Sequence, residues 1–263
     1  VLLLYRQYPW HFGTGNKIAS LSKDLSFNYL SYFSDKKLLT GLKISDSKNL
    51  ENNFNSLSES VDFCSLRFIR EKTEALSVRQ NVVQPLGNTI DSGVMLTVLH
   101  GGGIGYASTS DLSLAGLTAA LEIAKDWARI SAGRAVTDFS AISMPHPRAE
   151  YQSPVQTPWA STSLSDKLDY LREASEALGG SEAIVDWASS LRHVDTESLY
   201  LTSGGGRVHQ HLSHLMPGLT AVANRGTDTQ RRTFIDSCQQ GGLELLESMG
   251  YRDRAQHLSA EAI

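Results

Sequence analysis

Two glycine runs, each placed between stretches of strand-forming residues, constrain the fold of this chain more than any other feature. Gly101–Gly103 follows the apolar stretch 92–100, and Ser203–Gly206 separates 198–202 from 207–212. A short glycine-rich turn between two strand-like stretches is typical of a β-hairpin. Each run therefore predicts a pair of neighbouring antiparallel strands, because a parallel pair would need a much longer connection.

Further strand-like segments flank both runs, and helical patterns follow them. Leucine and alanine recur at spacings of three and four after Ser113, which predicts a helix that Asp111 or Ser113 caps and Gly133 ends. Ser163 and Asp166 resemble a capping box and predict a second helix. Strands are expected at 61–71, 74–83, 92–100 and 104–108, then at 184–193, 198–202, 207–212 and 219–224, with a last helix over 241–249. The pattern β-β-β-β-α therefore occurs twice, and it predicts an α+β fold, an antiparallel β-meander with packed helices.

Composition divides the chain into three parts. Residues 1–55 are rich in Ser, Asn and Lys and predict a variable N-terminal extension and linker. The segment 45–60, at the boundary with the next part, is either a polar linker or a short surface helix. Residues 56–133 hold the first group of strands and its helix. Residues 134–263 hold the second group, which begins with a long, proline-bearing extended connector over 135–158.

Charge, cysteine content and hydropathy exclude several classes of protein. A net charge of −4 argues against a protein that tracks nucleic-acid phosphates. The two cysteines, Cys64 and Cys238, form no zinc-binding pattern and suit a reducing compartment. No apolar run is long enough to span a membrane, and Val1–Leu4 is too short for a signal-peptide core. We therefore expect a cytoplasmic protein that binds neither membrane nor nucleic acid.

Three histidines form the most suggestive chemical cluster. On a strand, His209 and His211 would share one face and could both reach a metal ion, whereas His214 would lie on the other face unless the chain bends at Met216–Pro217. They are weak metal candidates, because a solvated strand that happens to carry histidines explains them better. The glycines at 101–105 have the wrong spacing for a phosphate-binding loop, and no G-x-S-x-G or H-E-x-x-H motif is present. The residues alone therefore identify no catalytic group.

Several short motifs in residues 56–132, taken together, resemble the N-terminal domain of the TldD/PmbA family. That domain has an Arg-bearing strand, an S-V-R strand, a Gly-Val strand and a G-[FY]-A-S-T-x-D-L-S turn before a helix. The matching segments here are 66–71 (LRFIRE), 76–79 (LSVR), 91–94 (DSGV) and 103–113 (GIGYASTSDLS). The motif residues, which we expect to be structural, are Arg67, Arg79, Gly93, Gly105, Tyr106, Ser108, Thr109 and Asp111. Residues 134–263 are similar to the family's central domain in the order of their elements.

The resemblance implies a zinc metallopeptidase that works in the cytoplasm on unfolded peptides. Family members pair as homodimers or with a related subunit, and an H-E-x-x-x-H helix in a C-terminal domain binds Zn²⁺. That motif is not in this sequence, so we expect no catalytic residue, zinc ligand or cofactor within it. The chain would then supply dimer contacts and the walls of a peptide channel. The alternative is a non-catalytic partner subunit or peptide-binding scaffold of the same family. An action on DNA gyrase, which an old family name suggests, is disfavoured by the acidic charge balance.

Overall fold

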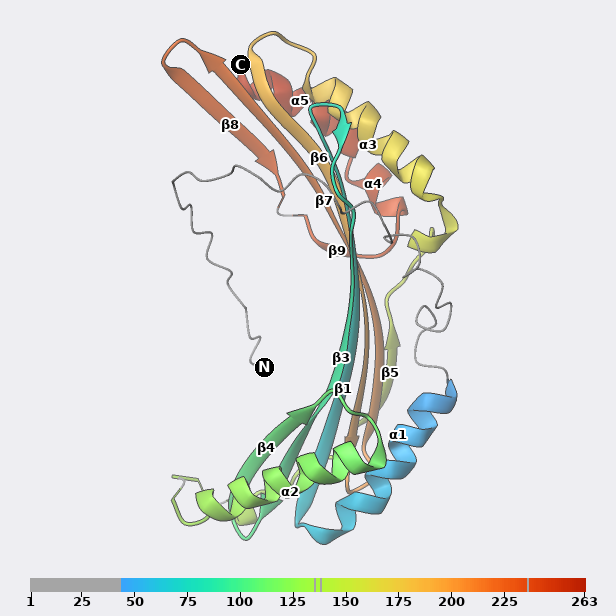
Figure 1. The fold of residues 1–263 in the computed structure, drawn as a ribbon, viewed down its shortest axis with the longest axis vertical. Coiled ribbons are helices and arrows are strands. Elements are labelled where there is room, and N and C mark those ends of the chain that lie inside the picture. The colour runs from blue at the N-terminus through green and yellow to red at the C-terminus, as the bar shows by residue number, and fades with distance from the viewer. Residues whose placement is uncertain (1–43, 135, 138, 236) are drawn as a thin grey trace, which may run out of the picture. The chain divides into compact units, whose positions relative to one another are not determined.

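A computed structural model describes residues 44–134, 136–137, 139–235 and 237–263, all within the compact unit Leu42–Ile263. Most of the predicted extension 1–55 therefore lies outside the described residues. Figure 1 shows the unit as a long sheet with α1 and α2 at one end and α3, α4 and α5 at the other. None of the described helices is long and apolar enough to cross a membrane.

The nine strands of the described residues form one sheet in the order β4-β3-β1-β6-β7-β5, with β2 pairing β1 and with β8 and β9 pairing β7. All neighbours run antiparallel except β5, which runs parallel to β7. The predicted α+β class with an antiparallel sheet is confirmed. The strands are β1 (Phe63–Arg79), β2 (Val82–Val83), β3 (Gly87–His100), β4 (Gly103–Thr109), β5 (Arg148–Gln152), β6 (Ile184–Thr202), β7 (Arg207–Arg225), β8 (Asp228–Phe234) and β9 (Gln239–Gln240).

Two of the helices begin where the sequence predicts. The Ser113 hydroxyl accepts the Gly116 N–H, and the Ser163 hydroxyl accepts the Asp166 N–H, so each serine satisfies an unpaired amide of the first turn. Most of the ambiguous segment 45–60 is helical. The helices are α1 (Ile44–Leu57), α2 (Leu114–Ser131), α3 (Leu164–Leu178), α4 (Glu244–Ser248) and α5 (Tyr251–Ala262), with 3₁₀ turns at Ser58–Ser60, Phe139–Ala141 and Trp159–Ser161.

The predicted division into short strands is wrong in both halves. The predicted strands 61–71 and 74–83 are one long strand, β1, which ends at Arg79 and is followed by the two-residue β2, and the four segments between 184 and 224 are two strands, β6 and β7. β1 pairs with β6 without interruption from Ser65↔Thr202 to Arg79↔Ala188. The breaks predicted at 72–73 and 194–197 contain neither glycine nor proline, so the backbone continues through them. The third, 213–218, contains Pro217 and Gly218, yet β7 keeps its pairing with β6 through both residues. The apparent gaps between predicted strands are therefore stretches where the side chains change along one continuous strand.

The C-terminal region also differs from expectation. The connector 135–158 contains β5, the predicted helix 241–249 is the shorter α4, and the sequence analysis missed α5. Gly250 has φ +60, which lets the chain turn between α4 and α5. The order β1-β2-β3-β4-α2 and then β6-β7-β8-β9-α4 keeps the predicted repeat in outline only, because the strands differ greatly in length.

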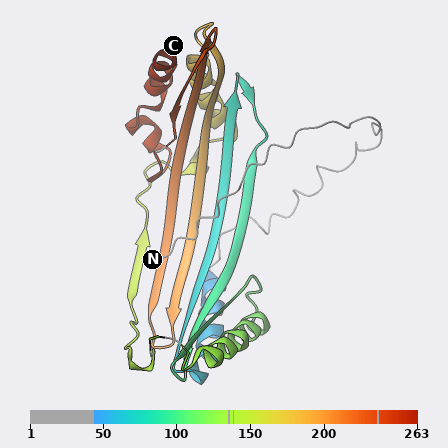
Figure 2. The same cartoon turned by 90° about the vertical axis from the view of Figure 1, so that its left-hand side faces the viewer.

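The described helices pack on one face of the sheet and, with it, form two separate hydrophobic clusters. The even-numbered positions of β1 supply Leu66 and Phe68 to the first cluster and Leu76 and Val78 to the second, so both clusters lie on the same face. The first cluster adds α1, α2 and the end of β6, and the second adds α3, α5 and β7. Figure 2 shows the long strands running between the two ends.

Gly105 sets how closely α2 approaches the sheet. A Cβ at this position would collide with the carbonyl oxygen of Ala124 and would lie 2.5 Å from the Ala128 nitrogen. We therefore expect Gly105→Ala to lower the free energy of unfolding by about 1–3 kcal/mol, because rigid backbone must move.

Gly180→Ala is the matched control, because its Cβ would meet only the Ala177 carbonyl at an ordinary 3.6 Å. Urea unfolding of both variants tests the prediction, and equal stability of the two would contradict close packing of α2 on β4.

Candidate functional site

The face of the sheet opposite the helices carries a compact group of exposed apolar side chains. Ile69, Met95 and Tyr106 are 41%, 46% and 55% exposed. The register places Arg67 opposite both Met95 and Tyr200, and places Ile69 and Tyr106 diagonally next to Met95. We call Arg67, Ile69, Met95, Tyr106 and Tyr200 the Met95 patch. Large exposed apolar residues gathered on one face are typical of a binding surface.

One cation lies at the centre of this patch. The Arg67 guanidinium carbon lies 5.8 Å from the centre of the Tyr200 ring, within the range of a cation–π contact. The patch therefore combines an aliphatic surface, two aromatic rings and one positive charge. Such a surface can pack against apolar side chains of an extended peptide and can attract a carboxylate.

Four of the motif residues predicted from the sequence meet at this patch. Arg67 and Tyr106 belong to it, Ser108 lies opposite Met95, and Gly93 lies opposite Ile69. Sequence reasoning identified these four as motif residues. It did not identify Ile69, Met95 and Tyr200 as surface residues of the same site. The strand register brings these residues and the motif residues together, and a sequence alone does not show which strands pair.

The remaining motif residues lie elsewhere. Gly105 faces α2, and the Thr109 hydroxyl accepts the N–H of Asp111 at 3.0 Å. Asp111 accepts the N–H of Ser113, and the bonds from Ser113 lower the pKa of this carboxyl. Arg79 lies at the far end of β1, where two of its nitrogens bind Asp186 at 2.9 Å. These residues shape the turn into α2 and the end of β1.

The histidine cluster divides between the two faces, as the spacing predicts. His209 and His211 lie on the helix-bearing face, whereas His214 pairs with Val194 on the opposite face. β7 keeps its register with β6 through Met216 and Pro217, so no bend brings His214 to the other two.

Each of the paired histidines binds a carboxylate on β6, which the sequence did not reveal. His209 Nε2 lies 3.2 Å from Glu197, and His211 Nε2 lies 2.9 Å from Asp195. Within the residues that the structure describes, no three His, Cys, Asp or Glu side chains come close enough to hold a metal ion. The zinc that the sequence resemblance implies therefore does not fit these residues.

A buried polar cluster lies beside the second hydrophobic cluster. The His193 ring stacks on Trp159 at 5.0 Å with an angle of 3°, and its Nε2 lies 3.0 Å from the Ser213 hydroxyl. Lys167 Nζ lies 4.0 Å from the centre of the Trp159 ring, and the Trp159 N–H donates to Glu74. Burial lowers the pKa of both Lys167 and His193. Burial alone would raise the pKa of Glu74, but the bonds from Lys72 and Trp159 outweigh it and lower this pKa.

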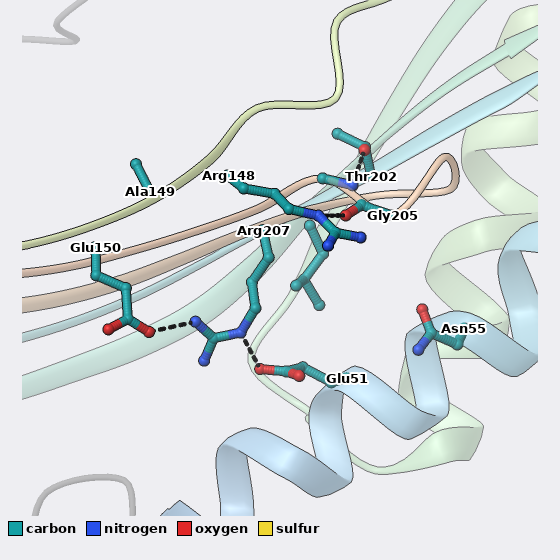
Figure 3. Close-up of a pocket in the computed structure, with 10 residues that line it drawn as sticks. Glu51, Asn55, Arg148, Ala149, Glu150, Thr202, Gly205 and Arg207 are labelled. Atoms are coloured by element: carbon teal, nitrogen blue, oxygen red, sulfur yellow. Dashed lines mark hydrogen bonds and ion pairs between the residues drawn. The ribbon is translucent and has the colours of Figure 1, made fainter.

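A cavity of about 500 Å³ lies between α1, β5 and the turn that joins β6 to β7 (Figure 3). Arg207 lines it and binds Glu51 and Glu150, each at 2.9 Å. Arg148 Nε donates to the Gly205 carbonyl. The two ion pairs of Arg207 connect α1 and β5 to β7. Because Glu51 and Glu150 already pair with this guanidinium, it is not available to a ligand, and we take the Met95 patch as the candidate site.

Comparison with protein families finds two domain matches in the same order as the chain. Residues 64–128 match the family model described as PmbA/TldA metallopeptidase domain 1, and residues 157–262 match the PmbA/TldA metallopeptidase central domain. No curated protein matches the chain.

Three solved structures share the fold. A candidate modulator of DNA gyrase from Thermotoga maritima has a TM-score of 0.62 at 13% identity, over 81% of this chain and 48% of its own. A second candidate modulator of DNA gyrase, from Bacteroides thetaiotaomicron, has a TM-score of 0.58 at 18% identity, over 74% of this chain and 45% of its own. TldE from Thermococcus kodakarensis has a TM-score of 0.59 at 17% identity, over 79% of this chain and 46% of its own. The chain therefore spans about half the length of these relatives.

The buried His193 makes stability depend on pH. Because its pKa is lower in the folded protein than the usual value near 6.5, the unfolded chain binds the proton more readily. Stability is therefore full above about pH 6.5 and falls as the pH decreases through that value. We expect the free energy of unfolding, measured in urea between pH 7.5 and 5.5, to decrease less in His193→Gln than in the wild type.

His257→Gln is the control, because His257 is exposed on α5. A pH dependence in His193→Gln that equals that of the wild type would show that His193 is not held neutral.

Proposed function

Because the chain belongs to the PmbA/TldD metallopeptidase family, we propose that it forms the first and central domains of a zinc peptidase that acts on unfolded peptides. Its role is to guide the peptide and to pair subunits. We place no catalytic step on these residues. In this proposal the zinc ligands belong to another part of the protein, since a domain named central has a domain on either side.

The observation that carries the proposal is the position of the Met95 patch. Among the described residues, no helix covers the face of the sheet on which the patch lies; the sheet runs through both matched domains, and motif residues of the first domain gather at the patch. An unfolded peptide differs from a folded protein in exposing apolar side chains along its whole length. A flat surface with apolar, aromatic and cationic groups suits such a ligand without requiring one sequence.

The proposal places the protein in the cytoplasm. Cys64 and Cys238 are both free, as thiols are in a reducing compartment, and burial raises the pKa of Cys64 to about 12. A thiol with so high a pKa is inert at neutral pH, so Cys64 serves packing and is no nucleophile.

Peptide binding tests the proposal. Met95→Glu places a second charge in the patch next to Arg67, removes apolar contact area and should weaken binding by about tenfold. The measurement is the fluorescence anisotropy of a fluorescein-labelled, oxidised insulin B chain titrated with the 263-residue chain.

Leu86→Glu is the matched control, because Leu86 is exposed to the same degree in the turn before β3 and the charge change is identical. Equal affinities of Met95→Glu and Leu86→Glu would exclude the patch as the peptide surface.

The catalytic part of the proposal predicts that this chain alone binds the labelled peptide without cleaving it. Atomic absorption should then find almost no zinc in the purified chain, and mass spectrometry should find the peptide intact. Stoichiometric zinc together with cleavage would place the active site within these residues and contradict the proposal.

A further inference from the structure

A cavity of about 340 Å³ lies between α3, α4 and the helix-bearing face of the sheet. Leu191 of β6, Leu243 at the start of α4 and Leu246 within it form an apolar side of this cavity, which we call the leucine wall. Cavities that bind small molecules combine apolar walls with a few polar groups and begin at about 300 Å³, so this one suits a small ligand. The other residues that line it are Thr162, Asp166, Lys167, Tyr170 and Glu247.

Lys167 is a buried cation with an incomplete set of partners. The residue is only 7% exposed, and its Nζ lies 4.0 Å from the centre of the Trp159 ring. The ring face attracts the charge, but an ammonium has three N–H groups to donate. Within the part of the chain that the structure describes, Lys167 Nζ donates no hydrogen bond and forms no ion pair. Its donors are therefore available to a ligand.

The acid whose charge acts on Lys167 is already engaged. Glu74 attracts Lys167 electrostatically, but one of its carboxylate oxygens binds Lys72 and the other accepts the Trp159 N–H at 3.0 Å. This group of side chains therefore holds two positive charges and one negative charge. Because a buried cation without a full partner is costly, a bound anion would offset that cost.

The Lys167 ammonium also reaches open space. Among the described residues, the enclosed side-chain nitrogen and oxygen atoms that lack a partner belong to His100 and Ser237. Lys167 Nζ has no hydrogen bond and yet is not one of these atoms, so it is not fully enclosed. The cavity that Lys167 lines is the space beside it.

Two carboxylates line the same cavity nearer to solvent. Asp166 and Glu247 are exposed, whereas Lys167 is buried. Asp166 accepts the O–H of Ser163 at 2.7 Å, while the Glu247 carboxylate has no hydrogen bond or ion pair with any other described residue. The cavity therefore has a cation on its buried side and carboxylates on its solvent side.

An α-amino acid with an apolar side chain matches these features together. Its carboxylate can bind Lys167, its ammonium can bind Glu247 on the solvent side, and its side chain can pack against the leucine wall. An organic acid without an ammonium would leave the two exposed acids unpaired beside a negative ligand. A phosphate ester carries about two negative charges at neutral pH, which suits one lysine beside two acids less well.

We propose that the cavity between α3 and α4 binds a free apolar amino acid, with its carboxylate on Lys167, its ammonium on Glu247 and its side chain against the leucine wall. The site lies within the matched central domain, on the face of the sheet opposite the Met95 patch. It goes beyond the proposed function and does not depend on it.

A titration of the 263-residue chain with L-leucine tests the proposal. The chain carries ¹³C-labelled leucine methyl groups, and methyl NMR spectra at pH 7.0 follow binding even when it is weak. L-Leucine should shift the methyl signals of the leucine wall in a saturable manner. The methyl signals of Leu66 and Leu117, which belong to the first hydrophobic cluster, should stay in place.

Three analogues of the ligand test its three contacts on the unchanged protein. N-acetyl-L-leucine lacks the ammonium, L-leucinamide lacks the carboxylate, and L-serine lacks the apolar side chain. Each should bind about tenfold more weakly than L-leucine, because each loses one charged or apolar contact.

Two variants assign the charges to their partners. Lys167→Met keeps a side chain that packs on Trp159, and it should weaken L-leucine about tenfold but leave the affinity for L-leucinamide unchanged. Glu247→Gln should weaken L-leucine and leave the affinity for N-acetyl-L-leucine unchanged. Glu176→Gln is the control, because Glu176 is exposed on α3 and does not line the cavity.

The contrary outcomes are equally definite. No shift of the leucine wall with L-leucine at tens of millimolar would overturn the proposal. Equal affinities of the wild type, Lys167→Met and Glu247→Gln for L-leucine would overturn it as well, and because Glu247 is exposed this comparison holds even if Lys167→Met fails to fold. Saturable shifts confined to the first hydrophobic cluster would place the amino acid elsewhere and would also contradict it.

Discussion

The long pairing of β1 with β6, and of β6 with β7 from Asp186 onward, is the constraint on which the rest of the structure depends. The register of these strands is continuous over the length that separates the two hydrophobic clusters. Each cluster alone resembles the core of a small domain, yet both form on the same strands. The backbone bonds between the clusters therefore hold the two matched family domains in a fixed relation, and they leave the opposite face of the sheet as one surface.

This continuity explains why the sequence predicts the fold class and misses the strands. The glycine turns at 101–103 and 203–206 and the caps Ser113 and Ser163 are local signals, and the structure contains all of them. The long strands carry charged and polar residues between the two clusters, among them Asp195 and Glu197. The hydrophobic pattern of the sequence predicts a loop at such residues. In the structure they belong to a strand, and they are polar because neither hydrophobic cluster covers that part of it.

The candidate site could be found from the sequence only in part, for a similar reason. The motif residues Arg67, Gly93, Tyr106 and Ser108 come from three strands, and only the pairing of β1, β3 and β4 brings them together. Tyr200 joins them from a strand more than ninety residues away from Tyr106. Equally, the carboxylates that bind His209 and His211 come from β6. Spacing within one segment predicts which residues share a face, but not which strand lies beside it.

Hydrogen exchange of the native chain tests most directly whether one continuous sheet joins the two domains. Amides of β1 and β6 between the clusters, in segments 70–74 and 194–197, should be protected about as strongly as those within the clusters, because they belong to the same cooperative ladder. Fast exchange confined to these two segments, with strong protection on both sides, would mean two domains joined by a flexible break and would contradict the shared sheet.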